Sequence, residues 1–313
     1  MPRVIEVKNL VKRYRKADTN AVDDISFSVN AGEFFALLGP NGAGKTTTIS
    51  ILTTTLAKTS GIVTIAGRDI DRGASAVRKN IGVIFQQPSL DLNLTAEENV
   101  RLHANLYGLY PFRPWYGLMP EQYKKRVHEL ANVLGITDAL FDPIKTFSGG
   151  MRRKLEIIRS LMHRPAILFL DEPTTGLDPV SRKNLWEYLQ QMRSQERTTI
   201  FLTTHYLDEA ENADRICIID HGKIISLGTP AETKKGLIAE YLLIDAKDRK
   251  ALRSELTHLG LAFTAADLFQ VSLGNKTAYQ IVKELRTPLT VLKIHNPTLE
   301  EAYLEMIQKE IRE

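Results

Sequence analysis

The 313-residue chain has one cysteine and no long apolar run, and both shortages exclude classes of protein. A single cysteine excludes an intrachain disulfide. Because Cys217 lies in the apolar segment RICIID, we expect a small buried core residue and no thiol metal site. No run of about 18 apolar residues is present that would suggest a membrane span. The first residues, MPRVIEVKNL, lack the apolar stretch of a secretion signal, so we expect a cytoplasmic protein.

Internal repeats and low-complexity segments are also absent from the sequence. The content of 43% hydrophobic and 25% charged residues is typical of a globular protein with one large or two smaller domains. The net charge of +4 suits an anionic partner, such as a membrane surface or a nucleic acid, without requiring one.

Five short apolar segments are each followed by a turn and a helical pattern. They are FFALLG (34–39), IGVIF (81–85), AILFLD (166–171), TIFLTT (199–204) and RICIID (215–220). Strands of this composition are usually buried on both faces, because helices cover both sides of a parallel sheet. The pattern predicts an α/β fold with a mainly parallel core sheet.

Two regions depart from this alternation. Between about residues 90 and 163 helical periodicity takes over and predicts a helical insertion, within which the proline- and aromatic-rich stretch 108–120 favours an ordered or partner-contacting loop. After about residue 235 the order becomes strand, helix, two strands, helix, strand and a final helix. That order predicts a small α+β domain over 236–313, of split βαβ, ferredoxin-like type, in which nothing looks catalytic.

The segment GPNGAGKTT (39–47) fits the phosphate-loop pattern and lies between an apolar strand and a helical run. Its three glycines permit backbone conformations in which successive N–H groups point at phosphate oxygens. Lys45 is expected to reach the β- and γ-phosphates, and the Thr46 hydroxyl to ligate magnesium. An ordinary glycine-rich turn is the alternative, which the strand and helix around it disfavour.

Two carboxylates, Asp171 and Glu172, end the buried strand AILFLD, at the edge where parallel sheets bind ligands. Beside a phosphate loop, Asp171 is expected to hold the metal through its water shell and Glu172 to orient and polarise the attacking water. Taken alone, the pair could equally end a strand and cap a turn.

Three further residues are candidates whose local sequence does not decide between function and packing. His205 follows an apolar strand and suits either a catalytic role or a helix start. Gln86 has the same placement, and its amide could reach metal or water. Tyr14, in the basic strand VKRYRK, could stack on an aromatic ligand or be an ordinary exposed tyrosine.

The segment TFSGGMRRKLE (146–156) is a second candidate phosphate loop, with Ser148, Gly149 and Gly150 ahead of a helix-favouring run. The basic cluster 152–154 that follows could attract a nucleotide or form a solvated helix face.

Together these motifs resemble the nucleotide-binding subunit of an ATP-binding cassette (ABC) transporter, over roughly residues 3–235 and in the family's order. The signature departs from the frequent LSGGQ at Phe147 and Met151 but keeps its Ser-Gly-Gly centre. The correspondence assigns the A-loop to Tyr14, Walker A to Gly39, Pro40, Asn41, Gly42, Ala43, Gly44, Lys45, Thr46 and Thr47, the Q-loop to Gln86 rather than Gln87, the signature to Ser148, Gly149 and Gly150, Walker B to ILFLDEP with Asp171 and Glu172, the D-loop to Asp178 and the switch histidine to His205.

The resemblance implies a P-loop NTPase cassette over residues 1–235, with a mainly parallel core sheet, an antiparallel β subdomain and the helical insertion. It implies ATP and Mg²⁺ as cofactors, with Thr46, Gln86 and Asp171 at the metal and Glu172, His205, Lys45 and Gln86 in catalysis. In this family two cassettes pack head to tail, so that Ser148 and Gly150 of one copy close over the ATP of the other, and Asp178 couples the two sites. The expected partners are therefore a second copy and an integral membrane permease, at the cytoplasmic face of the membrane.

The stretch LLGPNGAGKTTTISIL, the switch region TTHYLDEAE and the ending NPTLEEAYLEMI resemble exporter cassettes of the daunorubicin-resistance and Nod-factor type. Three alternatives remain at this level: an importer cassette, a soluble ABC ATPase acting on ribosomes or DNA, and an ATP-dependent scaffold without catalysis. Because Lys45, Asp171, Glu172 and His205 are all present, the scaffold is disfavoured.

Overall fold

The computed structural model describes residues 2–85, 90–234, 241–295 and 298–303, and it divides into two compact units. The first unit is Met1–Leu227 and the second is Gly228–Glu313. Each is described here by itself. In the described residues, no helix is both long and apolar enough to cross a membrane.

An antiparallel four-stranded sheet, in the order β2-β1-β4-β5, lies at the start of the first unit. Its strands alternate buried and exposed side chains, and Val7 pairs with Phe27 on one side and Val63 on the other. This sheet is the predicted antiparallel subdomain. Its elements, with the helix that follows β5, are β1 (Arg3–Lys12), β2 (Val22–Asn30), β4 (Ser60–Ile65), β5 (Arg68–Asp69) and α2 (Ile70–Asn80).

The second sheet of this unit has six strands in the order β10-β9-β3-β8-β7-β6, and the strands from β9 to β6 pair with their neighbours in parallel. The five predicted strands are confirmed, each within a residue of its expected bounds. Cys217 is fully buried in β9, and burial raises the pKa of its thiol to about 12, as expected of a core residue. The strands are β3 (Phe34–Leu38), β6 (Ile81–Ile84), β7 (Ile167–Asp171), β8 (Thr199–Thr204), β9 (Arg215–Asp220) and β10 (Lys223–Gly228).

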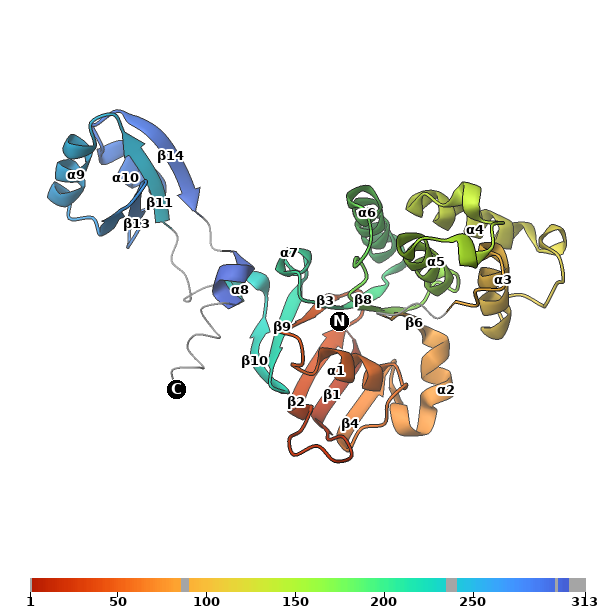
Figure 1. The fold of residues 1–313 in the computed structure, drawn as a ribbon. Coiled ribbons are helices and arrows are strands. Elements are labelled where there is room, and N and C mark those ends of the chain that lie inside the picture. The colour runs from red at the N-terminus through yellow and green to blue at the C-terminus, as the bar shows by residue number, and fades with distance from the viewer. Residues whose placement is uncertain (1, 86–89, 235–240, 296–297, 304–313) are drawn as a thin grey trace. The chain divides into compact units, whose positions relative to one another are not determined.

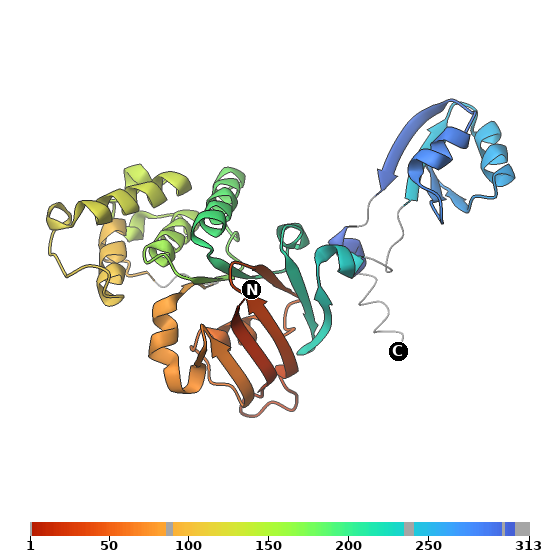
Figure 2. The same cartoon turned by 180° about the vertical axis from the view of Figure 1, so that it is seen from behind.

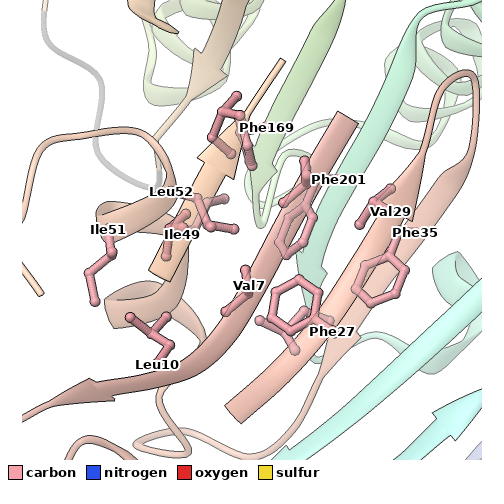
Figure 3. Close-up of a cluster of buried hydrophobic side chains, with 14 of the residues drawn as sticks. Val7, Leu10, Phe27, Val29, Phe35, Ile49, Ile51, Leu52, Phe169 and Phe201 are labelled. Atoms are coloured by element: carbon pink, nitrogen blue, oxygen red, sulfur yellow. The ribbon is translucent and has the colours of Figure 1, made fainter. Parts of the chain in front are cut away.

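The main core lies between the two sheets and around α1 (Lys45–Leu52), the helix that follows the phosphate loop. Figure 3 shows aromatic rings of the two sheets meeting aliphatic side chains of α1. Phe35 stacks on Phe27 and on Phe201, with ring centroids 5.4 Å apart in both pairs. Burial of this apolar surface fixes α1 against the sheet, and with it the loop at the start of α1.

The other face of the six-stranded sheet is covered by helices (Figures 1 and 2). The helices on this side are α3 (Ala96–Leu106), α4 (Glu121–Leu134), α5 (Gly149–Leu161), α6 (Pro179–Glu196) and α7 (Leu207–Ala210). Of these, α5 contacts β6 and α7 contacts β3 and β8, whereas α3 and α4 of the predicted insertion pack on α5 and α6. Local sequence sets their ends: a Thr95–Glu98 capping box opens α3, and Gly135, in the left-handed conformation, closes α4.

The aromatic-rich stretch 108–120 forms a loop with one short 3-10 helix, η1 (Tyr116–Leu118). Arg101 holds it from α3 by donating to the carbonyl oxygens of Arg113 (2.6 Å) and Pro114 (2.8 Å). Two more short 3-10 helices precede α5, η2 (Thr137–Ala139) and η3 (Ile144–Thr146).

The second unit contains an antiparallel sheet in the order β12-β13-β11-β14. Apolar side chains of β11 and β13 pack with Leu252, Leu256 and Ile281 of two helices to form a separate small core. Its elements are α8 (Pro230–Lys234), β11 (Tyr241–Ala246), α9 (Arg249–His258), β12 (Phe263–Ala265), β13 (Phe269–Ser272), α10 (Ala278–Glu284) and β14 (Leu289–His295). The α/β fold class with a small C-terminal α+β part is confirmed.

Candidate functional site

The phosphate loop joins the carboxyl end of β3 to α1, as its sequence predicted. Lys45 is buried at the start of α1, and its Nζ donates to the carbonyl oxygens of Gly39 (2.7 Å) and Pro40 (3.0 Å). Burial lowers the pKa of the Lys45 ammonium, while the charges of Glu172 and Asp171 oppose that shift. The lysine is therefore held inside the loop, within the field of both acidic candidates.

Two glycines of this loop are required by close backbone contacts. Gly44 has φ +107°, and a Cβ there would lie 2.4 Å from the carbonyl oxygen of Ala21. At Gly39 a Cβ would lie 2.1 Å from the carbonyl oxygen of Ile219. Only glycine fits at either position, because any side chain would collide with main chain.

The remaining loop residues differ in exposure. Ala43 is buried, Pro40 and Thr47 are half-buried, and Asn41, Gly42 and Thr46 are exposed. The first amides of α1 have no intrahelical partner, as at any helix start, so the loop and the first turn of the helix together suit an anion.

Tyr14 lies beyond the end of β1, in the loop that follows Lys12, and not in a strand as its sequence suggested. Its hydroxyl is 3.2 Å from the hydroxyl of Thr47, so the exposed ring lies close to the first turn of α1. The ring leaves the strand because the chain turns at residues 15–16, where Lys16 has a positive φ.

Asp171 ends β7 at the same edge of the sheet and is almost fully buried. The hydroxyl of Thr203, on the neighbouring strand β8, donates to Asp171 Oδ1. Burial raises the pKa of the Asp171 carboxyl, and the Thr203 hydrogen bond opposes this by favouring the ionised form. Thr203 was not predicted as a site residue, although its place at the end of a parallel strand was the signal for it.

Glu172 follows directly and has a positive φ of 49°, which is uncommon for a residue with a side chain. Its N–H donates to the Thr203 carbonyl (3.0 Å), and its Oε1 lies 2.9 Å from Nδ1 of His205. The imidazole is about half exposed, whereas the carboxylate is mostly buried. The two side chains form a pair with one end open to solvent, an arrangement suited to handling a proton or a water molecule.

The second candidate phosphate loop lies at the start of α5. Ser148 is the N-cap residue, and its hydroxyl accepts from the Met151 N–H (3.2 Å). Gly149 and Gly150 form the first turn, and a Cβ at Gly150 would come within 3.0 Å of the Gly176 carbonyl oxygen. The start of α5 thus packs closely against the segment that leads to Asp178.

Asp178 caps the next helix, α6, by accepting from the N–H (2.9 Å) and the hydroxyl (2.6 Å) of Ser181. Lys154 of α5 forms an ion pair with it at 3.0 Å. The Ser181 hydrogen bonds, with help from Lys154, hold the pKa of the Asp178 carboxyl well below its usual range. The starts of α5 and α6 are therefore joined through Asp178.

The basic cluster 152–154 was predicted either to attract a nucleotide or to form a solvated helix face. Neither prediction fits Arg153. Arg153 is buried, and its guanidinium donates to the main-chain carbonyls of Phe85, Asp171 (3.0 Å), Glu172 (2.8 Å) and Pro173 (3.1 Å). It is neither a solvated residue nor a nucleotide contact. The helix places it behind the acidic strand end, a contact that its local sequence cannot reveal.

Gln86 and Gln87 lie outside the described residues. The adjacent residue, Phe85, is described and follows β6.

Known proteins resemble this chain in sequence and in fold. A family model described as "ABC transporter" matches residues 22–175. The daunorubicin/doxorubicin resistance ATP-binding protein DrrA of Streptomyces peucetius is 42% identical over 258 residues, which cover 82% of this chain and 74% of that protein. The Nod factor export ATP-binding protein I of Ralstonia nicotianae is 34% identical over 324 residues, covering 99% of this chain and 95% of that protein. The chain belongs to the ABC transporter family.

A solved ABC cassette agrees with this assignment. The dimeric structure of a post-hydrolysis state of the ATP-binding cassette MJ0796, bound to ADP and Pi, matches with a TM-score of 0.64 at 26% identity, covering 72% of this chain and 98% of that one. The predicted resemblance is confirmed, and the chain is an ABC-type ATPase.

One more buried residue of this cassette, Glu209, was missing from the predicted site. Glu209 of α7 accepts hydrogen bonds from Thr174, two residues after Glu172, and from Thr204, directly before His205. Its signal was weak, because an acidic residue in the run LDEAE reads as part of an exposed helix face.

Proposed function

We propose that this chain binds and hydrolyses Mg-ATP at sites shared by a head-to-tail dimer and so drives export by a separate membrane subunit. The observation that carries the proposal is the placement of its two phosphate-binding segments. The P-loop starts α1 on one face of the six-stranded sheet, and Ser148 starts α5 on the other (Figures 1 and 2). Two such helix starts on opposite faces suit two surfaces that meet across a pair of chains.

Within one chain, hydrolysis uses the P-loop and the strand ends beside it. Lys45 would exchange the carbonyls of Gly39 and Pro40 for the β- and γ-phosphates, which compensates its burial with anionic charge. Glu172 would orient and polarise the attacking water. His205 Nδ1 donates to Glu172, which leaves Nε2 for the γ-phosphate or that water.

The donor set of this site fits magnesium. Thr46 presents an exposed hydroxyl, and Asp171 a buried carboxylate of which one oxygen already accepts from Thr203. Hard oxygen donors, few from protein and the rest from water and phosphate, are what Mg²⁺ prefers. The bound ion would neutralise charge on the β- and γ-phosphates; Gln86 remains a third candidate ligand.

The proposed dimer depends on the signature segment at the start of α5. Ser148 and the amides of Gly149 and Gly150 would bind the γ-phosphate held by the other copy, so ATP bridges two surfaces and hydrolysis removes the bridge. Tyr14, beside Thr47, would stack on the adenine. Asp178 would couple the two sites from the segment against which Gly150 packs.

A membrane subunit must dock on the cassette to receive its motion. A groove of about 240 Å³ lies between the sheet and the helical insertion and is the docking site we propose. Thr55, Arg78, Phe85, His103 and Tyr107 are among its lining residues. A groove that ends next to the predicted Q-loop suits a short helix of the membrane partner. Export is the direction favoured by the names of the relatives, and it would place the cassette at the cytoplasmic face of the membrane.

The test is ATP hydrolysis and oligomeric state of the full chain, with and without Mg-ATP. Glu172→Gln should lower the rate by about 10² to 10⁴ and should accumulate an ATP-dependent dimer, because a water-orienting carboxylate is worth that much. Adding Ser148→Arg to that variant should abolish the dimer, and chelation of magnesium should abolish hydrolysis.

Glu187→Gln is the matched control, because Glu187 is an exposed carboxylate of α6 that pairs with Lys183 at 3.8 Å. It should hydrolyse ATP at the wild-type rate. Normal hydrolysis by Glu172→Gln would show that the assigned chemistry is wrong, and ATP binding without any dimer would remove the shared site.

A further inference from the structure

Glu209 is a buried carboxylate with no assigned role. It lies in the short helix α7 with 6% of its surface exposed. Each of its carboxylate oxygens accepts a hydrogen bond from a threonine hydroxyl. Thr174 Oγ1 donates to Oε1, and Thr204 Oγ1 donates to Oε2 at 2.8 Å. Burial raises the pKa of this carboxyl, and the two threonine hydrogen bonds oppose the shift. A carboxylate buried this deeply destabilises a fold unless it is hydrogen-bonded, so both hydroxyls matter.

The two threonines belong to the two segments that carry the proposed catalytic pair. Thr174 follows Glu172 by two residues, and Thr204 is the last residue of β8, directly before His205. Both are fully buried. The Thr204 hydroxyl also accepts from the Tyr206 N–H (2.9 Å), so its own hydrogen is directed to Glu209 and the turn around His205 is fixed from both sides.

We propose that Glu209 is a positioning residue: through Thr174 and Thr204 it holds the Glu172 segment and the His205 segment at the separation where Nδ1 meets Oε1. This inference rests on the proposed function of that pair. Glu209 itself touches neither reacting atom. Its role is to keep the 2.9 Å contact between His205 and Glu172 in place before ATP arrives.

Loss of this link should affect turnover more than binding. Misplacement of a reacting group by about 1 Å can cost 10²-fold in rate. The P-loop, which would bind the phosphates, has hydrogen bonds of its own: Lys45 donates to the carbonyls of Gly39 and Pro40, and the Gly222 N–H donates to the Ala43 carbonyl. A change confined to the pair removes an interaction of the transition state, which lowers kcat and leaves KM nearly unchanged.

The experiment measures kcat, KM for Mg-ATP and thermal unfolding of full-length variants. Glu209→Gln, which keeps the shape and removes the charge, should lower kcat by about 10- to 100-fold with KM changed by less than about threefold. Asp208→Asn is the matched control, because Asp208 is an exposed acid on the same helix. Its kcat should stay within about twofold of wild type, as for most surface changes.

A threonine series separates positioning from packing. Thr204→Val removes the hydroxyl and keeps the shape, whereas Thr204→Ser keeps the hydroxyl. The valine variant should lose kcat like Glu209→Gln, the serine variant should retain it, and combining Thr204→Val with Glu209→Gln should cost less than about twofold more, because both changes break one link.

Two results would overturn the inference. One is a kcat within about threefold of wild type for Glu209→Gln, and the other is equal loss in Thr204→Ser and Thr204→Val, which would show a packing role. If Glu209→Gln does not fold, the Thr204 series decides alone. Failure of the proposed function is recognised separately, because Glu172→Gln would then hydrolyse ATP normally whatever Glu209 does.

Discussion

Arg153 offers the sharpest test of how the acidic strand end is held. Its guanidinium donates to four main-chain carbonyls, one at Phe85 and three in succession at residues 171–173. Arginine can do this because its planar group carries five N–H donors on several atoms. Burial lowers the pKa of this guanidinium, and the carboxylates of Glu156, Asp171 and Glu172 oppose the shift.

Arg153→Lys keeps the positive charge but removes the planar group that reaches all four carbonyls. A lysine ammonium has three donors on one atom, so at least one of the four carbonyls should lose this partner. Each buried carbonyl left unsatisfied costs about 1–3 kcal/mol, so the free energy of unfolding should fall by at least about 1–3 kcal/mol. Because two of the carbonyls belong to Asp171 and Glu172, kcat for ATP should also fall, by about tenfold or more.

Urea unfolding of the full chain measures the first effect and steady-state hydrolysis the second. Arg152→Lys is the matched control, because the Nε of Arg152 has no hydrogen-bond partner in the described residues. A loss of less than about 1 kcal/mol in Arg153→Lys, or an equal loss in Arg152→Lys, would refute the argument that the four carbonyls depend on this guanidinium.

Two further substitutions test the P-loop and the groove. Gly44→Ala places a Cβ 2.4 Å from the Ala21 carbonyl oxygen at φ +107°. The control is Gly108→Ala, where φ is +69° and no atom lies within 4 Å of the added Cβ, so that stability should fall by about 1 kcal/mol. Thermal unfolding should show a larger loss of stability for Gly44→Ala than for this control. Equal losses would show that the clash is relieved. Burial lowers the pKa of His103 to about 3, so as pH falls below about 6.5 the unfolded chain takes up a proton that the folded chain does not, and stability is lost. His103→Phe, which keeps an aromatic ring against Tyr107, should remove up to about 2 kcal/mol of the loss seen in urea unfolding between pH 7 and pH 5; an unchanged pH dependence would contradict this.

Much of the fold could be predicted because its signals are local. Parallel strands that are buried on both faces are apolar throughout, and each of the five predicted strands satisfied this rule. The same rule placed Asp171, Glu172 and His205 at one edge of one sheet, because parallel strands end together. Ser148 could be placed at a helix start because serine followed by two glycines and a helical run is an N-cap pattern.

The supporting contacts could not be predicted, because they join residues far apart in sequence. Arg153 reads as one of three basic residues on a helix, and only the packing of α5 against the sheet at β6 turns it inward. Glu209 reads as part of an acidic run, yet Thr174 reaches it from 35 residues away. Tyr14 was placed in a strand because the apolar and basic pattern continues past Lys12, where the chain in fact turns.

These supporting contacts also connect the proposed signature segment to the strand ends that carry Glu172 and His205. Gly150 lies close to the Gly176 carbonyl, and Lys154 pairs with Asp178, so the start of α5 is joined to the segment that follows Glu172. A phosphate from another copy bound at Ser148 would therefore pull on the same segment that Glu209 ties to the turn around His205. Coupling between sites requires an element whose position both ligands bias, and we propose the 172–178 segment as that element. It follows that breaking the Glu209 link should leave ATP-dependent dimerisation of the Glu172→Gln variant intact, because the link lies between the shared segment and the histidine, beyond the dimer contact.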